Sequence, residues 1–232
     1  MMVRLLLAAS LTSCLLHGED PMPVFRPGAH ILFQGDSITD GNRGRNGDPN
    51  HILGHGYAFL IAARFGAAMP ERNLIFLNRG ISGNKVSDLA ARWEKDALEL
   101  KPDMLSILIG INDSMKKVPI DDFENVYDGL LAAAVAANPK VHLVLCEPFI
   151  LPVGRSKQEF EEVLEDVKLR QAVVFRLAVK YRAAVVHFQK VFDDACKRAP
   201  AEYWIWDGVH PTYSGHQLMA EEWVRVVSQL GM

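Results

Sequence analysis

The sequence contains little of what several classes of protein require. Its three cysteines, Cys14, Cys146 and Cys196, are too few and too scattered for a disulfide framework, and none lies in a Cys-x-x-Cys pair or beside histidines at metal-ligand spacing. No stretch gathers the roughly five to eight lysines or arginines of a nucleic-acid patch, and the formal net charge is −3. Zinc sites, redox centres and nucleic-acid binding therefore have no support.

The composition is that of an ordinary folded protein. Hydrophobic residues make up 49% and charged residues 23% of the 232 residues, without the Gln, Ser or Pro bias of disordered chains. The length suffices for one sizeable α/β domain and is short for two.

The N-terminus resembles a targeting segment. Arg4 is followed by an apolar run over residues 5–16, which has signal-peptide length and is too short to span a bilayer. Within it, Leu11-Thr12-Ser13-Cys14 resembles a bacterial lipobox, in which the cysteine is lipidated. We therefore expect a signal peptide or lipoprotein leader over residues 1–21, a domain over residues 22–232, and export to the periplasm or to a lipid anchor at Cys14. The alternative is translation from Met22, which predicts a cytoplasmic protein.

From residue 29 onward, short apolar runs alternate with longer amphipathic ones. This pattern predicts repeated βα units around a parallel sheet with helices on both faces. We expect five strands at residues 30–34, 74–78, 104–109, 141–146 and 183–187. The clearest helical stripe contains Phe160, Val163, Leu164, Val167, Val174, Leu177 and Tyr181, and a last helix should begin after Pro211, with Thr212 or Ser214 as N-cap, and run to Gly231.

Ligands of open parallel sheets bind beyond the carboxyl ends of the strands, and the first three predicted strands end in polar segments. These segments are Gly35-Asp36-Ser37-Ile38-Thr39-Asp40, Asn78-Arg79-Gly80-Ile81-Ser82-Gly83 and Gly110-Ile111-Asn112-Asp113, and Asp207-Gly208-Val209-His210-Pro211 stands near the C-terminus. Acyl transfer needs a hydroxyl nucleophile, a base, an acid that orients the base, and donors for the developing oxyanion. Together the four segments could supply every part.

Taken singly, these features have ordinary explanations. A Gly-Asp-Ser is usually a loop, and an isolated Asp-x-x-His is more often a turn aspartate and a solvated histidine. In combination, Asp207 can hold one ring nitrogen of His210 while the other faces Ser37. The Gly80 N–H and the Asn112 amide could approach a substrate carbonyl.

The ordered set Gly-Asp-Ser, Gly, Gly-x-Asn-Asp and Asp-x-x-His resembles the four blocks of the GDSL (SGNH) hydrolases. The resemblance implies a three-layer α/β/α sandwich with a flavodoxin-like five-stranded sheet, the SGNH hydrolase fold. It also implies a triad of Ser37, Asp207 and His210, an oxyanion hole formed by Ser37, Gly80 and Asn112, and no metal or cofactor.

The similarity to bacterial acetylxylan esterases of this family extends over nearly all of residues 30–228, through F-Q-G-D-S-I-T-D, N-R-G-I-S-G-N, D-L-A-A-R-W, I-G-I-N-D and W-D-G-V-H-P. It implies removal of acetyl groups from sugars such as xylo-oligosaccharides. Aromatic rings are good platforms for sugars, so Trp206 is a candidate for substrate contact, together with Asp36; packing in the core or at an edge is the alternative for Trp206 and its neighbours Tyr203 and Trp204.

Three functions stay open at this point. The first is the carbohydrate acetylesterase, acting on small-molecule or oligosaccharide acetyl esters. The second is a lysophospholipase, lipase or thioesterase on the same fold, because fold and triad do not choose the acyl chain. The third is a non-catalytic carbohydrate-binding protein. No stable protein partner is predicted, although a homo-oligomer is compatible with the sequence.

Residues outside the proposed triad receive more modest roles. Asp40, Arg43, Asn84 and Asp113 are expected to brace the loops through hydrogen bonds, since polar groups at strand ends must be satisfied. His51 and His55, in the long polar loop at residues 41–56, are expected to face solvent.

Overall fold

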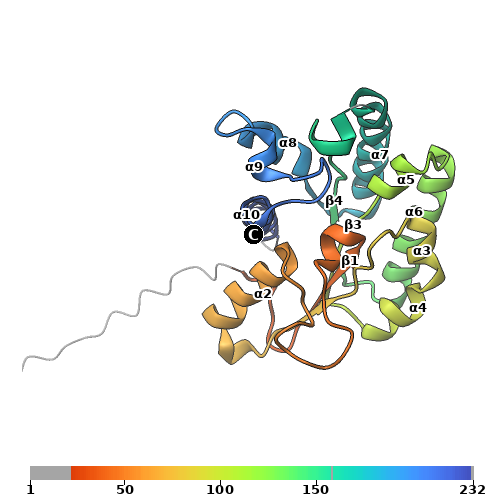
Figure 1. The fold of residues 1–232 in the computed structure, drawn as a ribbon. Helices are drawn as coiled ribbons and strands as arrows, with labels where there is room; N and C mark the ends of the chain where they lie inside the picture. The colour runs from red at the N-terminus through yellow and green to blue at the C-terminus, as the bar shows by residue number, and fades with distance from the viewer. Residues whose placement is uncertain (1–21, 158, 231–232) are drawn as a thin grey trace, which may run out of the picture.

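The computed structural model describes residues 22–157 and 159–230. The predicted leader over residues 1–21, with Cys14, lies outside the described residues. Five parallel strands form one sheet in the order β2-β1-β3-β4-β5, which is the flavodoxin-like order (Figure 1). The strands are β1 (His30–Gly35), β2 (Ile75–Asn78), β3 (Met104–Leu108), β4 (His142–Cys146) and β5 (Ala184–Val186). Each agrees with its predicted range to within one residue at either end.

Burial across the sheet explains why the strands read as apolar runs. Every residue of the central strand β3 is buried, because β1 and β4 pair with it on both sides and helices cover both faces. At the edge, β2 is only partly buried.

Helices cover both faces of the sheet and make the sandwich three-layered, as predicted. On one face α2, α8 and α10 pack around buried rings that include Phe33, Tyr57 and Trp223. On the other, α3, α4, α6 and α7 bury a mostly aliphatic cluster around Leu105 and Ile107 (Figure 1). The α-helices are α1 (Ser37–Asp40), α2 (Tyr57–Ala68), α3 (Val86–Ala91), α4 (Trp93–Asp96), α5 (Ile111–Met115), α6 (Ile120–Ala137), α7 (Phe160–Tyr181), α8 (Phe188–Ala195), α9 (Ala201–Trp204) and α10 (Tyr213–Val227).

Two helices test the periodicity argument directly. Helix α7 covers the whole predicted stripe from Phe160 to Tyr181. Helix α10 begins after Thr212, whose hydroxyl accepts a hydrogen bond from the Gly215 N–H, as an N-cap should. It ends at Val227, earlier than the predicted Gly231, and residues 228–230 form a turn in which Ser228 Oγ donates to the Arg225 carbonyl.

The sheet brings the polar segments together at the carboxyl ends of its strands. Residues 36–40, 79–84 and 110–115 follow the carboxyl ends of the adjacent strands β1, β2 and β3, and the C-terminal turn at residues 207–210 reaches the same edge through Ser37. Within the described residues, no helix is both long enough and apolar enough to cross a membrane.

Candidate active site

Ser37 is the first residue of α1, immediately after β1. The preceding Asp36 is the N-cap, and its Oδ1 accepts a hydrogen bond of 3.0 Å from the Ile38 N–H. Ser37 Oγ lies 2.8 Å from His210 Nε2, although the two residues are 173 positions apart. At the first helical position the Ser37 N–H has no intrahelical acceptor, so it is free for a ligand.

The turn at residues 207–210, which we call the acid–base turn after its predicted role, orients its own histidine. Asp207 Oδ2 lies 2.7 Å from His210 Nδ1, and Asp207 Oδ1 accepts hydrogen bonds from the backbone N–H groups of Val209 and His210. Burial alone would raise the pKa of Asp207, but the hydrogen bonds from His210 and Val209 outweigh it and lower the pKa. The ionised carboxylate keeps the proton on Nδ1, which leaves Nε2 as an acceptor for the Ser37 hydroxyl.

Asn112 lies in the first turn of α5, after β3. Its Nδ2 donates to the Asn84 carbonyl over 3.1 Å, which engages one of its two N–H bonds. The side chain lines the same pocket as Ser37 and His210. The second N–H is therefore available to a ligand oxygen beside the serine.

Gly80 and Gly83 both belong to the oxyanion loop, which we define as residues 79–84. The Gly80 N–H already donates to Asn78 Oδ1 over 2.9 Å, which speaks against the predicted role of Gly80 as an oxyanion donor. Gly83 has a φ of +82°, and within the described part of the chain its N–H has no acceptor and a Cβ added to it would meet no atom within 4 Å. Gly83 is thus the loop glycine with a free backbone donor.

Asp36 is fully buried, and this speaks against the predicted substrate contact. Burial raises the pKa of Asp36 to about 7. Its Oδ2 has no hydrogen-bond partner among the described residues. The side chain caps α1 instead, which is a structural role that the spacing of the motif alone did not indicate.

A pocket of about 910 Å³ opens beside the serine. Ser37, Asn112 and His210 line it, together with residues of α7 and of the segment after α5. Trp206 also lines the pocket; its ring is 64% exposed and stacks at 29° on the His210 ring, with the ring centroids 6.4 Å apart. Trp204, by contrast, is buried in the core.

The pocket wall combines apolar and acidic side chains. The apolar group includes Met115, Val118, Ile120, Val163 and Leu169. The charged group is mostly acidic, with Glu159, Glu162, Glu165 and Asp166 on or next to α7. Three of these four carboxylates have a cationic partner: Lys117 pairs with Glu162, Lys168 with Glu165 and Arg170 with Asp166.

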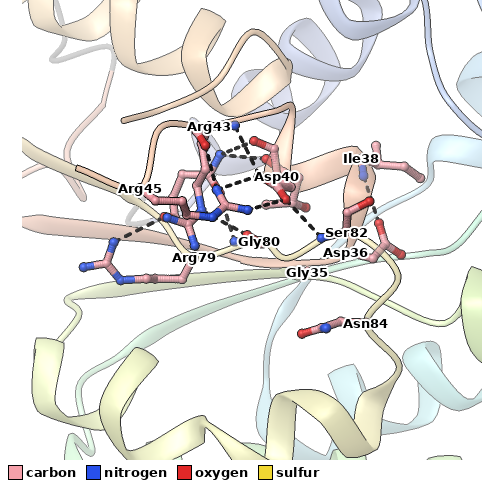
Figure 2. Close-up of polar contacts among 12 residues, drawn as sticks. Gly35, Asp36, Ile38, Asp40, Arg43, Arg45, Arg79, Gly80, Ser82 and Asn84 are labelled. Atoms are coloured by element: carbon pink, nitrogen blue, oxygen red, sulfur yellow. Dashed lines mark hydrogen bonds and ion pairs between the residues drawn. The ribbon is translucent and has the colours of Figure 1, made fainter. Parts of the chain in front are cut away.

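The remaining predicted residues brace loops or face solvent. Asp40 accepts from the Ser82 N–H, and the Arg43 Nε donates to the Gly80 carbonyl (Figure 2). Asn84 Oδ1 accepts from the Arg92 Nε. Asp113 is buried and accepts from the Val86 N–H, and His51 and His55 are exposed. Within residues 22–157 and 159–230, no group of three or more His, Cys, Asp or Glu side chains is arranged to hold a metal ion.

Comparison with protein families gives a match over most of the chain. The family model of the GDSL-like lipase/acylhydrolase family matches residues 33–218. A curated relative, the acetylxylan esterase of Geobacillus stearothermophilus, is 33% identical over 213 residues, which cover 86% of this chain and 94% of the relative.

Solved structures are also similar. A protein described as a GDSL-like lipase from Parabacteroides merdae superposes with a TM-score of 0.82 at 37% identity, covering 87% of this chain and 96% of its own. The acetylxylan esterase of Geobacillus stearothermophilus superposes with a TM-score of 0.75 at 30% identity, with the same two coverages. Catalytic variants of that esterase in which a serine or an aspartate is replaced by alanine have also been solved.

Proposed function

The chain belongs to the GDSL-like lipase/acylhydrolase family and is a carboxylic ester hydrolase, and we propose that it removes acetyl groups from acetylated sugars through an acyl-enzyme on Ser37. The observation that carries the proposal is the continuous relay from Asp207 through His210 to Ser37 Oγ at the end of an open pocket.

In the first half of the reaction, Ser37 Oγ attacks the acetyl carbonyl carbon while His210 Nε2 takes the hydroxyl proton. The negative charge that develops on the carbonyl oxygen is stabilised by N–H donors. The free donors of Ser37, Gly83 and Asn112 suit this role. The intermediate collapses when His210 returns the proton to the sugar oxygen, which leaves as an alcohol.

In the second half, a water molecule attacks the acetyl-serine. His210 Nε2 accepts its proton and then donates a proton to Ser37 Oγ as acetate leaves. Asp207 stays ionised throughout and stabilises the imidazolium that forms twice per turnover, which agrees with the lowered pKa of its carboxyl group.

The size of the pocket favours an ester whose leaving group is larger than the acetyl group. Its volume of about 910 Å³ is far more than an acetyl group needs, and the Trp206 ring offers an apolar face at its edge. A curated relative that is an acetylxylan esterase supports the same class.

A lipase or thioesterase is the second candidate. The apolar pocket residues, Met115 and Leu169 among them, could receive a hydrocarbon chain in place of a sugar.

One experiment separates the two candidates. Wild type and Ser37→Ala are compared for acetate release from peracetylated xylose and acetylated xylo-oligosaccharides, and for hydrolysis of acetyl and octanoyl p-nitrophenyl esters. We expect serine-dependent acetate release and a poor octanoyl rate. A faster octanoyl rate would establish the lipase or thioesterase, and hydrolysis that survives Ser37→Ala would contradict the mechanism.

A further inference from the structure

A single buried carboxylate joins the nucleophile helix α1 to the oxyanion loop. Asp40 is the last residue of α1 and is 3% exposed. Its Oδ2 accepts the Ser82 N–H over 3.0 Å, and its Oδ1 accepts the Arg43 N–H over 3.2 Å (Figure 2). Asp40 therefore bonds to the residue directly before Gly83.

The counterion of this carboxylate comes from the long loop at residues 41–56. Arg45 donates to both Asp40 oxygens, over 3.0 Å from Nη1 and 2.7 Å from Nη2, in a bidentate pair. Burial would raise the pKa of Asp40, but the hydrogen bonds from Arg45 and from the Ser82 N–H outweigh it and lower the pKa. Asp40 is thus ionised and can accept from all of its partners at once.

The same contact region is tightly packed. A Cβ on Gly80 would lie 2.4 Å from the Asp40 N, so the oxyanion loop presses directly against the end of α1. The Arg43 Nε, from the same polar loop as Arg45, donates to the Gly80 carbonyl over 3.0 Å. Arg43 of the polar loop and Asp40 of α1 therefore hold the oxyanion loop on the two sides of Ile81.

These contacts link two proposed oxyanion donors through one short helix. The Ser37 N–H stands at the start of α1, and Asp40 at its end holds Ser82, whose peptide with Gly83 carries the second donor. The separation and direction of the two N–H groups then depend on Asp40. Misplacement of a catalytic group by about 1 Å can cost roughly 10²-fold in rate.

We propose that Asp40 and Arg45 are positioning residues, which touch no substrate but hold the Gly83 N–H against the Ser37 N–H for the transition state. This inference rests on the proposed esterase mechanism. It assigns the exposed polar loop at residues 41–56 a part in catalysis through Arg45.

The test measures kcat and KM on an acetyl ester for Asp40→Asn, Arg45→Ala and Arg45→Lys. We expect kcat to fall about 10- to 100-fold in Asp40→Asn and about tenfold in Arg45→Ala, with KM nearly unchanged, because the donors act mainly on the oxyanion of the transition state. Arg45→Lys should recover part of the loss, since lysine keeps the charge but not the bidentate geometry.

The affinity for a transition-state mimic distinguishes a positioning role from a purely structural one, because a purely structural role would leave this affinity unchanged. Phenylboronic acid accepts Ser37 Oγ at boron while His210 takes the serine proton, which gives a tetrahedral anionic adduct. We expect its affinity to fall in proportion to kcat in Asp40→Asn and Arg45→Ala. Arg176→Ala is the matched control, because Arg176 is 53% exposed against 52% for Arg45 and forms an equivalent pair with Glu124 between α7 and α6.

The outcomes separate this inference from the function on which it rests. Activity that survives Ser37→Ala overturns the mechanism itself. Serine-dependent activity with wild-type kcat and boronate affinity in Arg45→Ala overturns the positioning role alone. If Asp40→Asn loses its folded structure, judged by its Tm, the half-exposed Arg45 still decides the question.

Discussion

The two sides of Ser37, the proposed nucleophile, are built in opposite ways. On the nucleophile side, buried side chains such as Asp40 and Asn78 bind backbone groups about 40 residues away: Asp40 holds Ser82, and Asn78 holds the Thr39 carbonyl. On the acid–base side, Asp207 bonds to Val209 and His210 of its own turn, and the His210 side chain is 39% exposed.

This difference follows from what each side must do. A histidine needs one acceptor to choose its tautomer, and a single turn can provide it. An oxyanion hole needs donors from several chain segments converging on one point, and each must be held before the charge develops. The acid–base turn is therefore locally organised, whereas the nucleophile side depends on the packed strand ends.

The largest loss of kcat should come from substitutions in the acid–base turn. His210→Ala removes the base that contacts Ser37 Oγ and should lower kcat about 10⁴- to 10⁶-fold, while Asp207→Asn should lower it about 10⁴-fold through the wrong tautomer. Steady-state rates on an acetyl ester measure both. Because the turn is local and partly exposed, the Tm of both variants should stay near that of wild type; a large drop would contradict the comparison.

On the nucleophile side, Asn112→Ala should cost about 10²- to 10³-fold in kcat, roughly 3–4 kcal/mol, with little change in KM, since the amide stabilises mainly the transition state. Asn112→Asp is the sharper variant, because a carboxylate of equal size repels the oxyanion. If Asn112→Asp were the more active of the two, the donor role of this side chain would have to be abandoned.

The buried Asp36 should give the nucleophile side a distinctive pH dependence. Its carboxyl group has a pKa of about 7 in the folded state, against 3.8 for an ordinary aspartate, so its contribution to stability is present below about pH 4 and is lost as pH rises towards 7. The stability of Asp36→Asn relative to wild type should therefore increase by about 2–4 kcal/mol over this interval. Urea unfolding at about pH 4, 5.5 and 7 measures it.

The quantity to compare is the difference in unfolding free energy between wild type and Asp36→Asn, because His216 changes the stability of both proteins with pH in the direction opposite to Asp36. Burial lowers the pKa of His216 to about 4, which makes stability rise over part of the same interval in both proteins. A relative stability that does not change with pH would mean that Asp36 is already ionised in the folded protein.

The smallest effect, a change in KM, is expected at Trp206, which lies next to the acid–base turn. Trp206→Ala should raise KM for acetylated xylo-oligosaccharides about 5- to 10-fold, or about 1 kcal/mol, and leave hydrolysis of ethyl acetate nearly unchanged. Tyr213→Ala is the control, since Tyr213 is 83% exposed but does not line the pocket. Equal losses on both substrates would indicate that Trp206 supports His210 rather than the sugar.

The local parts of this site could be predicted because they depend on short spacings. The strands follow from apolar runs, helix α7 from one stripe, and the contact of Asp207 with His210 from a three-residue separation that a turn can close. The N-cap of the last helix was narrowed to Thr212 or Ser214, and the structure shows that it is Thr212.

The loop glycines show where that reasoning ends. Gly80 and Gly83 are three residues apart in one polar segment, and spacing could not say which N–H stays free. The answer depends on Asn78, whose Oδ1 accepts the Gly80 N–H, and on the close approach of the end of α1 to Gly80. The burial of Asp36 was missed for a related reason, because the charged groups that face it, Asp113 and His210, come from distant parts of the chain.

By itself, the sequence determined the order and type of the elements and the acid–base turn, since these follow from hydrophobic periodicity and from hydrogen bonds that close within a few residues. Only the tertiary structure decided which donors face the serine, that Asp36 is enclosed, and that Arg45 reaches Asp40 beside Ser82. Those features depend on how segments about 40 or more residues apart meet at the sheet edge, and no local pattern in the chain specifies that meeting.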